Sequence, residues 1–209
     1  MSNPSPQKAL EKPFSEVISA SGDFVIAQCY KDPLIDSKGD VLLGSLVKLV
    51  SSYDNSHASF GLVTKISNSS IDSVHKPQAL GLNIKELETF HPQLHDLLKK
   101  ELEIYLFAHK ENEEFQNYPP LKPALIHDFV YKVSENEFLR LTEDLSNIIT
   151  IVKRYKLSLN LLYSLIKNSY KMRKNDYNYL LKTGKMLTTG LEEDLKPVMD
   201  LLKRLQEDT

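Results

Sequence analysis

The sequence predicts an α+β protein in which a small closed antiparallel β-barrel is followed by a C-terminal helical bundle. Up to about Gly81 the apolar residues alternate or form short runs between turn residues, a pattern typical of antiparallel strands. After Ser134 the apolar residues recur at helical spacing instead. The chain of 209 residues, 41% of them hydrophobic, is long enough to form one large domain or two small ones.

Four strands are expected in the N-terminal part, at residues 14–21, 24–30, 44–52 and 60–67. The turns between them are too short for crossover helices, which argues against a parallel α/β sheet. Residues 68–72, with the sequence NSSID, should form a tight exit from the fourth strand. Two later strands, at 104–108 and 126–133, would complete a barrel of five to seven strands.

An inserted helix is expected at about 83–100, because Leu87, Phe90 and Leu94 begin a run at helical spacing. Pro92 either breaks this helix or begins a new one. We expect the inserted helix to cover one open end of the barrel. The prolines of the segment YPPLKP (118–123) should lie at the edge of the sheet, where no ladder hydrogen bond is lost.

The C-terminal helices have recognisable start signals. Ser134 and Glu137 form a capping box that opens a helix reaching to Val152. Further helices should begin at Ser158, near Asn175-Asp176 and at about Leu191, which makes a bundle of three or four helices. The expected organisation is therefore a flexible segment at 1–13, a barrel domain at 14–133 and a helical domain at 134–209.

Motifs for catalysis or cofactor binding are missing from the sequence. The seven glycines form neither a dinucleotide fingerprint nor a Walker motif, since Tyr179 and Met186 occupy required positions around Gly184-Lys185. His91 and His95 lack a third metal ligand at a suitable spacing. The single cysteine, Cys29, lies in an apolar run and is interpreted as a small buried hydrophobic residue. We therefore expect no cofactor, no metal and no catalytic residue.

A hydrolase is the least supported of three hypotheses on function. It would use His127 beside Asp128, or the acidic cluster Glu111, Glu113 and Glu114. Neighbouring residues on a strand point to opposite faces, so His127 and Asp128 are poorly placed to act together. The sequence also lacks a G-x-S-x-G nucleophile turn. We expect that the protein is not an enzyme.

A second hypothesis is nucleic-acid binding by a basic segment between residues 153 and 185. It holds nine basic residues against one acidic residue, Asp176, so the rest of the chain is net acidic. Basic side chains bind phosphates and tyrosines stack on bases. The alternatives are a solvated basic face and docking on an acidic partner. The expected phosphate-binding residues are Lys153, Arg154, Lys156, Lys167, Lys171, Arg173, Lys174, Lys182 and Lys185, and the expected stacking residues are Tyr155, Tyr163, Tyr170 and Tyr177.

Six segments together are similar to a known family: FVIAQCY (24–30), GSLVKLV (44–50), FGLVTKISNSSIDSVHKPQALG (60–81), HPQLHDLLKKELEIYLFAH (91–109), YPPLKPALIHDFVY (118–131) and NYLLKTGKMLTTGLEEDLKPVMDLLKRL (178–205). Through them most of the chain resembles the HAS-barrel family, whose barrel is shared by HerA-type helicases and ATP synthases, and looks like a stand-alone bacterial or cyanobacterial-like member. The resemblance implies a barrel without catalytic residues that contacts partners, and structural roles for Gly61, Ile71, Asp72 and Pro77. The chain departs from the family's motors because helices, not an ATPase domain, follow the barrel.

The first hypothesis is accordingly a non-catalytic adaptor or assembly module that binds a protein partner. The resemblance points to an ATPase or a DNA-processing protein as that partner. We expect no secretion signal, because the first residues, MSNPSPQKALEKP, lack an apolar core. No stretch approaches the roughly 20 apolar residues that span a bilayer. We therefore expect a cytoplasmic protein that does not contact membranes.

Overall fold

The computed structural model of the chain describes residues 12–30, 41–52, 57–72, 78–91, 97–111, 114–192 and 195–207. The expected flexible segment 1–13 lies almost wholly outside the described residues. The strands are β1 (Ser15–Ser21), β2 (Phe24–Cys29), β3 (Leu46–Val50), β4 (Ala58–Ser70), β5 (Leu98–Glu111), β6 (Glu114–Gln116) and β7 (Phe129–Lys132). The helices are α2 (Ile84–Phe90), α4 (Glu135–Leu141), α5 (Ser146–Arg154), α6 (Asn160–Met172), α7 (Tyr177–Gly190) and α8 (Leu195–Glu207).

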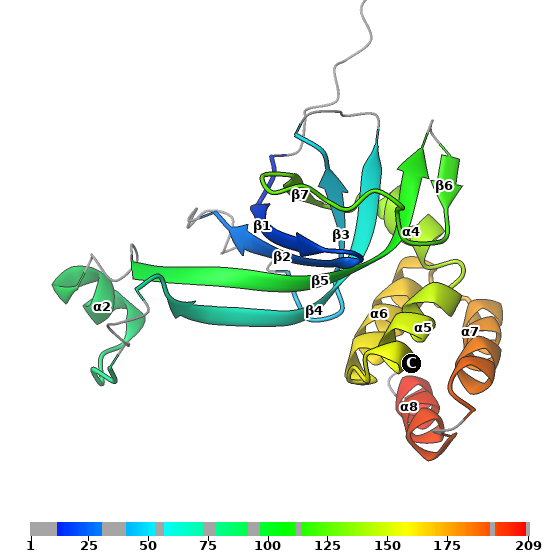
Figure 1. Cartoon of the computed structure of the whole chain (residues 1–209). Coiled ribbons are helices and arrows are strands. Elements are labelled where there is room, and N and C mark those ends of the chain that lie inside the picture. The colour runs from blue at the N-terminus through cyan, green and yellow to red at the C-terminus, as the bar shows by residue number, and fades with distance from the viewer. Residues whose placement is uncertain are drawn as a thin grey trace, which may run out of the picture.

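Six strands form a closed antiparallel barrel, as the sequence predicted (Figure 1). The strand order is β2-β1-β7-β3-β4-β5, and a further pairing between β2 and β5 closes the cylinder. The short strand β6 pairs with the end of β5 and stands outside the barrel. Closure pairs the backbone groups of neighbouring strands and removes the free edges that an open sheet would present.

The barrel interior is filled by apolar side chains. Residues on alternate positions of β5 point inward, which gives this strand the period of two that a half-buried strand requires. The inward residues come from every strand of the barrel and are buried: Val17, Val25, Ala27, Val47, Leu49, Val63, Leu102, Ile104, Leu106 and Val130. The centre of the barrel is thus a packed core.

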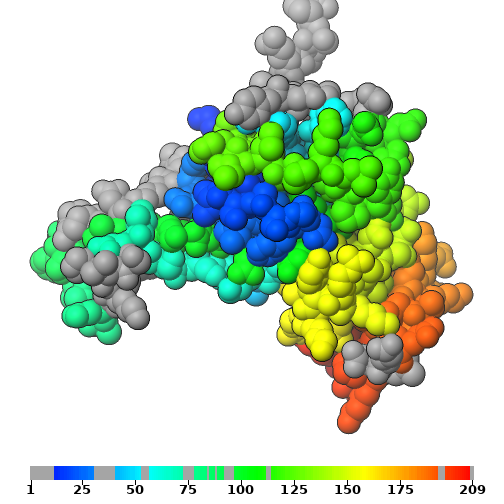
Figure 2. All heavy atoms as spheres, in the orientation of Figure 1, coloured from blue at the N-terminus to red at the C-terminus, as the bar shows by residue number. Residues whose placement is uncertain are grey.

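The strands β4 and β5 are longer than predicted and extend beyond the barrel. The prediction of a tight exit at 68–72 is wrong, because Asn68 and Ser70 continue the ladder opposite Lys100 and Leu98. Since β2 stops pairing with β5 at Glu101, the outer part is a ribbon of two strands. We call this ribbon, residues 68–72 and 97–100, together with residues 78–91, the arm. Figure 2 shows the arm standing clear of the barrel and the C-terminal helices.

The inserted helix differs from its prediction in length and position. It covers Ile84–Phe90 and begins with a capping box in which Asn83 accepts a hydrogen bond from the Glu86 amide. It ends at His91, directly before Pro92, and residues 92–96, where the alternative of a new helix would fall, lie outside the described residues. Residues 98–100 are strand instead of helix, because they pair with Ser70, Ser69 and Asn68 of β4. The helix lies at the end of the arm and does not cover the barrel (Figure 1).

The C-terminal region contains α4 to α8, more helices than the three or four predicted. The Ser134–Glu137 capping box is present, but the helix that it opens ends at Leu141 instead of reaching Val152. The Thr142 hydroxyl donates back to the Phe138 carbonyl, and Asp144 accepts from the Ser146 amide at 2.9 Å at the start of α5. These side-chain bonds compete with helical ones and separate α4 from α5. Helix α7 ends at Gly190.

The helices pack on the outside of the barrel. Phe60 and Leu62 of β4 and Phe107 of β5 belong to the same buried cluster as Leu145, Ile148 and the other inner residues of the helices. Strand β4 is therefore buried on both faces over this stretch, with Val63 inside the barrel and Phe60 against the helices. Among the described helices, none has the length and apolar content needed to cross a bilayer.

Candidate functional site

A cavity with a volume of about 550 Å³ lies at one end of the barrel. Its walls are the end of β3, the beginning of β4, the end of β5 and the segment 118–128, and we call it the loop cavity. The side chains of its apolar wall are Leu49, Ala58, Tyr118, Pro120, Leu121, Pro123, Ala124 and Leu125.

His109 is the most buried ionisable side chain on the barrel side of this cavity, with 9% of its surface exposed. Its Nδ1 lies 3.0 Å from the carbonyl oxygen of Tyr118, and the two rings meet edge to face with centroids 4.8 Å apart. A carbonyl oxygen can only accept, so Nδ1 donates this hydrogen bond. The ring orientation is therefore fixed by a backbone group.

Asp128 fixes the segment that forms the outer wall. Its carboxylate accepts hydrogen bonds from the amide of Leu125 at 2.8 Å and from the amide of Ser52 at 3.1 Å. The main-chain oxygen of Asp128 accepts from Val17, and the His127 amide donates to Val17 in return. The bond from Leu125 lies within the segment, and the other three attach the segment to β1 and to Ser52, just after β3.

The exposed residues of segment 118–128 are unusually apolar. Leu121 is 93% exposed, and Tyr118, Leu125 and Ile126 are also exposed. The basic residues Lys110 and Lys122 border the cavity. The Nε2 atom of His57 lies 3.6 Å from a carboxylate oxygen of Glu111. The loop cavity thus joins an apolar wall to a rim of mixed charge.

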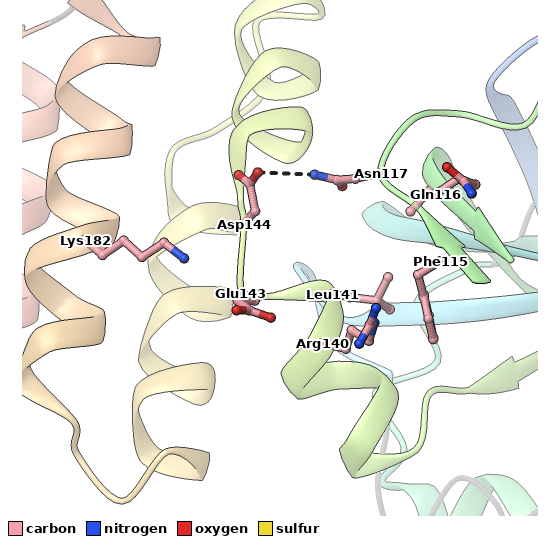
Figure 3. Close-up of a pocket in the computed structure, with 9 residues that line it drawn as sticks. Phe115, Gln116, Asn117, Arg140, Leu141, Glu143, Asp144 and Lys182 are labelled. Carbon is pink, nitrogen blue, oxygen red and sulfur yellow. Dashed lines mark hydrogen bonds between the residues drawn. The ribbon is translucent and has the colours of Figure 1, made fainter. Parts of the chain in front are cut away.

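A smaller cavity of about 270 Å³ lies where the β5–β6 hairpin meets the helices (Figure 3). Figure 3 shows Asp144 facing Asn117, whose side-chain amide donates across 3.5 Å, with Lys182 extending toward it from α7. The Ser146 hydroxyl is the main cause that lowers the pKa of Asp144. Arg140 lies over the ring of Phe115, with its guanidinium carbon 5.3 Å from the ring centroid. These contacts join the hairpin to the helices.

The end of the arm carries a third candidate surface. Five large apolar side chains on the arm are exposed, and Phe90 is the most exposed at 65%. The ribbon places two of them side by side, because the Ile71 amide donates to the Leu97 carbonyl at 2.8 Å. The five residues, which we call the arm-tip residues, are Ile71, Leu80, Phe90, Leu97 and Leu98.

Most tyrosines expected to stack on bases are not on the surface. Tyr170 is buried in the helical core, and the Tyr163 ring lies beneath Lys167 and Arg204. Tyr155 is half-buried and packs on Tyr105 of the barrel. Tyr177 is exposed to 57%. The interleaving of basic and aromatic residues in the sequence therefore arises mainly from packing.

The nine basic residues lie in several environments. Arg173 is turned inward, where it donates to Thr142 at 3.0 Å and to Ser169 and the Leu139 carbonyl. Lys182 borders the small cavity, and Lys167 lies over Tyr163 beside α8. The remaining residues are exposed, and they are Lys153, Arg154, Lys156, Lys171, Lys174 and Lys185.

Other expected site residues have structural surroundings. Gly61 lies at a register shift between β4 and β5, where a Cβ atom would be 2.3 Å from Ile104 Cγ2. The Asp72 amide donates to the Ser70 hydroxyl, while Ile71 is exposed. Cys29 is half-buried, so it is less enclosed than expected. Pro77, Glu113 and His95 lie outside the described residues.

His127 does not pair with Asp128. It adopts a positive φ of 75°, directs Nδ1 to the Glu16 carboxylate and is largely exposed. The hydrogen bond from His127 and a second one from Tyr30 lower the pKa of Glu16. Glu111 and Glu114 face each other across the β5–β6 turn. Within the described residues, no group of three or more His, Cys, Asp or Glu side chains could hold a metal ion.

Comparison with known proteins gives no assignment. No protein-family model matches the chain, and no curated protein is significantly similar to it.

Proposed function

We propose that this protein is a non-catalytic adaptor that binds a protein partner through the end of its arm. The observation that carries the proposal is the exposure of the five arm-tip residues on the projecting arm. Large exposed apolar patches on soluble domains mark interaction sites. A ribbon of two strands is only marginally stable by itself in water. Contact with a partner would both cover the apolar side chains and stabilise the arm.

The resemblance to the HAS-barrel family supports the same kind of function and the class of partner. In that family the barrel contacts other proteins and has no catalytic residues. The closed barrel of six strands is compatible with this resemblance. We therefore propose an ATPase or a DNA-processing protein as the partner, in a cytoplasmic setting.

The proposal is tested by cross-linking from the arm in cells of the source organism. A photo-reactive amino acid at Leu97 should capture one abundant partner, which mass spectrometry then identifies. The double variant Phe90→Ser and Leu98→Ser should remove the capture without changing the fold, because both side chains are exposed. The control is Leu181→Ser, which alters an exposed leucine on α7. Equal capture by all variants would contradict the proposal.

Direct nucleic-acid binding is the alternative, and a charge-reversal variant separates it from the adaptor function. The six exposed basic residues are its remaining support, because most of the proposed stacking residues are packed. A labelled single-stranded oligonucleotide should then bind in a salt-dependent manner and lose affinity in the variant Lys153→Glu and Lys156→Glu. The adaptor proposal expects this variant to capture its protein partner as well as the unchanged chain does.

A further inference from the structure

One edge of strand β4 is covered by no described strand where β4 leaves the barrel and enters the arm. Up to Val63 this edge is covered, because the Gly44 amide donates to the Val63 carbonyl and the Val63 amide donates to the Ser45 carbonyl, both at 2.9 Å. From Lys65 to Ser70, β4 pairs with β5 alone among the described strands. Figure 1 shows β4 and β5 running side by side toward α2. The other edge of β4 therefore offers main-chain N–H and C=O groups to a further strand.

The side chains along this edge are compatible with a further strand. Residues 67–70 are Ser, Asn, Ser and Ser, which are short and uncharged. Charged side chains are a common protection of exposed edges against pairing. The stretch 65–70 has one charged residue, Lys65, and its ammonium lies 2.7 Å from the Glu103 carboxylate of β5. The protection is thus limited to one lysine at the barrel end, whose charge is already matched.

Antiparallel pairing with a second copy of the chain fits the charges of this edge. Opposite residues of an antiparallel pair point to the same face, so a two-fold axis between two copies of one strand places a residue opposite itself. With Ser67 at the axis, Lys65 of each copy faces Ser69 of the other copy. The two lysines then stay apart, whereas like charges directly opposite would destabilise the pairing.

The two ends of the free edge carry exposed apolar side chains that match each other. At the barrel end, Leu42 and Leu43 are 61% and 50% exposed, in the turn that adjoins Val63. At the arm end, Ile71 is 51% exposed directly after β4. With Ser67 at the axis, Ile71 of one copy falls opposite Val63 of the other and so approaches Leu42 and Leu43. The match occurs twice in a symmetric pair, which selects a second copy as the occupant of the edge.

We propose that the chain forms a two-fold dimer in which the free edge of β4 pairs antiparallel with the same edge of a second copy, with Ser67 at the axis. The interface is isologous, since the same residues of each copy form it. This inference goes beyond the adaptor function. The dimer presents two arms that point in opposite directions, and Leu80 and Phe90, which lie outside the β4 edge, remain for the partner that each arm binds.

Sedimentation equilibrium of the full-length chain over a range of concentrations tests the dimer. The mass should rise from 23.9 kDa to twice that value as the concentration increases. Ser67→Lys should raise the dissociation constant of the dimer by at least about tenfold, because two lysines then meet at the axis. Within one chain the new lysine lies opposite Glu101 of β5, so circular dichroism should show an unchanged fold.

A mixture of two variants tests the position of the axis. Ser67→Lys chains mixed with Ser67→Glu chains should associate more tightly than either variant alone, because a lysine then faces a glutamate across the axis. Leu43→Ser should weaken the dimer by removing an apolar contact at each end. The matched controls on the helices are Asn168→Lys and Leu181→Ser, at exposed positions, which should alter the dissociation constant by less than about twofold.

Three results would each overturn the inference: a mass of one chain at every concentration, a dimer that Ser67→Lys leaves unchanged, and a mixture that associates no better than its components. The arm variant Phe90→Ser and Leu98→Ser should still dimerise, since neither residue lies on β4. Loss of the dimer in this arm variant alone would place the contact at the arm tip and reject the pairing of β4. A monomer that still captures its partner would leave the adaptor function standing and reject the dimer.

Discussion

The hydroxyl of Tyr155 donates to the carboxylate of Asp23, with oxygen–oxygen distances of 3.0 and 3.2 Å. The two residues are 132 positions apart and join the end of α5 to the turn between β1 and β2. The Tyr155 ring also lies 4.2 Å from the Tyr105 ring, which in turn lies 5.0 Å from Phe24. A row of three aromatic rings thus connects the helices to the barrel.

Replacing Tyr155 by Phe should destabilise the protein while keeping the aromatic row. The change removes a hydrogen bond to a charged group, which is worth about 1.5–3 kcal/mol at partly buried positions. We expect the lower part of this range, because Asp23 can turn toward water. Urea unfolding measures the loss, and Tyr177→Phe, at an exposed tyrosine, is the control. Equal stability of the two variants would show that the bond to Asp23 contributes nothing.

Replacing Gly61 by Ala should disrupt the β4–β5 pairing. The new Cβ atom would lie 2.3 Å from Ile104 Cγ2 and 3.2 Å from the Tyr105 carbonyl oxygen. Because Ile104 is packed inside the barrel, the expected loss is about 1–3 kcal/mol. Gly184→Ala in α7 is the opposite case, since its Cβ would meet Leu202 at an ordinary 3.5 Å. It should stabilise by about 0.5–1 kcal/mol, and thermal melting of both variants checks the two signs.

The Lys48–Glu137 pair should make stability depend on pH. Burial raises the pKa of the Glu137 carboxyl, but hydrogen bonds from Ser134 and the Lys48 ammonium, 3.0 Å away, outweigh it and hold the pKa below its ordinary value of 4.5. Because the pKa of Glu137 is lower in the folded state, its ionised carboxylate stabilises the protein above about pH 4.5. This stabilisation is lost as the pH falls through the folded-state pKa. Glu137→Gln should therefore cost about 1–2 kcal/mol at pH 7 and much less near pH 3. A cost that is the same at both pH values would contradict the role of the charge.

Arg173 should behave as a structural residue. Its guanidinium carbon lies 4.2 Å from the Tyr179 ring centroid, and its hydrogen bonds reach α4 and α6. Lysine cannot reproduce the planar array of donors, so Arg173→Lys should cost about 2–3 kcal/mol. The exposed neighbour Lys171→Arg is the control and should be neutral. Chemical denaturation of both variants decides between a structural role and a surface role for Arg173.

The sequence was sufficient to predict the barrel and the C-terminal helices. Alternation located the barrel strands, and the Ser134–Glu137 capping box located the start of α4, since both patterns are local. The arm was not predictable in the same way. Leu94, Leu98 and Leu102 fit a helix by spacing, and the pairing of 98–103 with β4 and β2 depends on contacts distant in the sequence.

The candidate site was less predictable than the fold. From the sequence, His127 and Asp128 form a possible catalytic pair. In the structure the Asp128 carboxylate instead accepts a hydrogen bond from the Leu125 amide, and His127 Nδ1 is directed to the Glu16 carboxylate. The charge of Arg173 gave no sign that its guanidinium is turned inward. The loop cavity has a weak sequence signal in the apolar residues between the prolines of 118–126. Whether an apolar side chain is exposed depends on the tertiary structure, so the sequence alone does not predict it.

The apolar cluster shared by β4, β5 and the helices has a consequence for dissection of the chain. A cut between Val133 and Ser134 would separate Phe60, Leu62 and Phe107 from the helical residues that cover them. Each fragment would then expose to solvent a surface that the intact chain keeps dry. The strand-rich and helix-rich halves should consequently melt together in one calorimetric transition, and neither half should survive as an independently expressed piece.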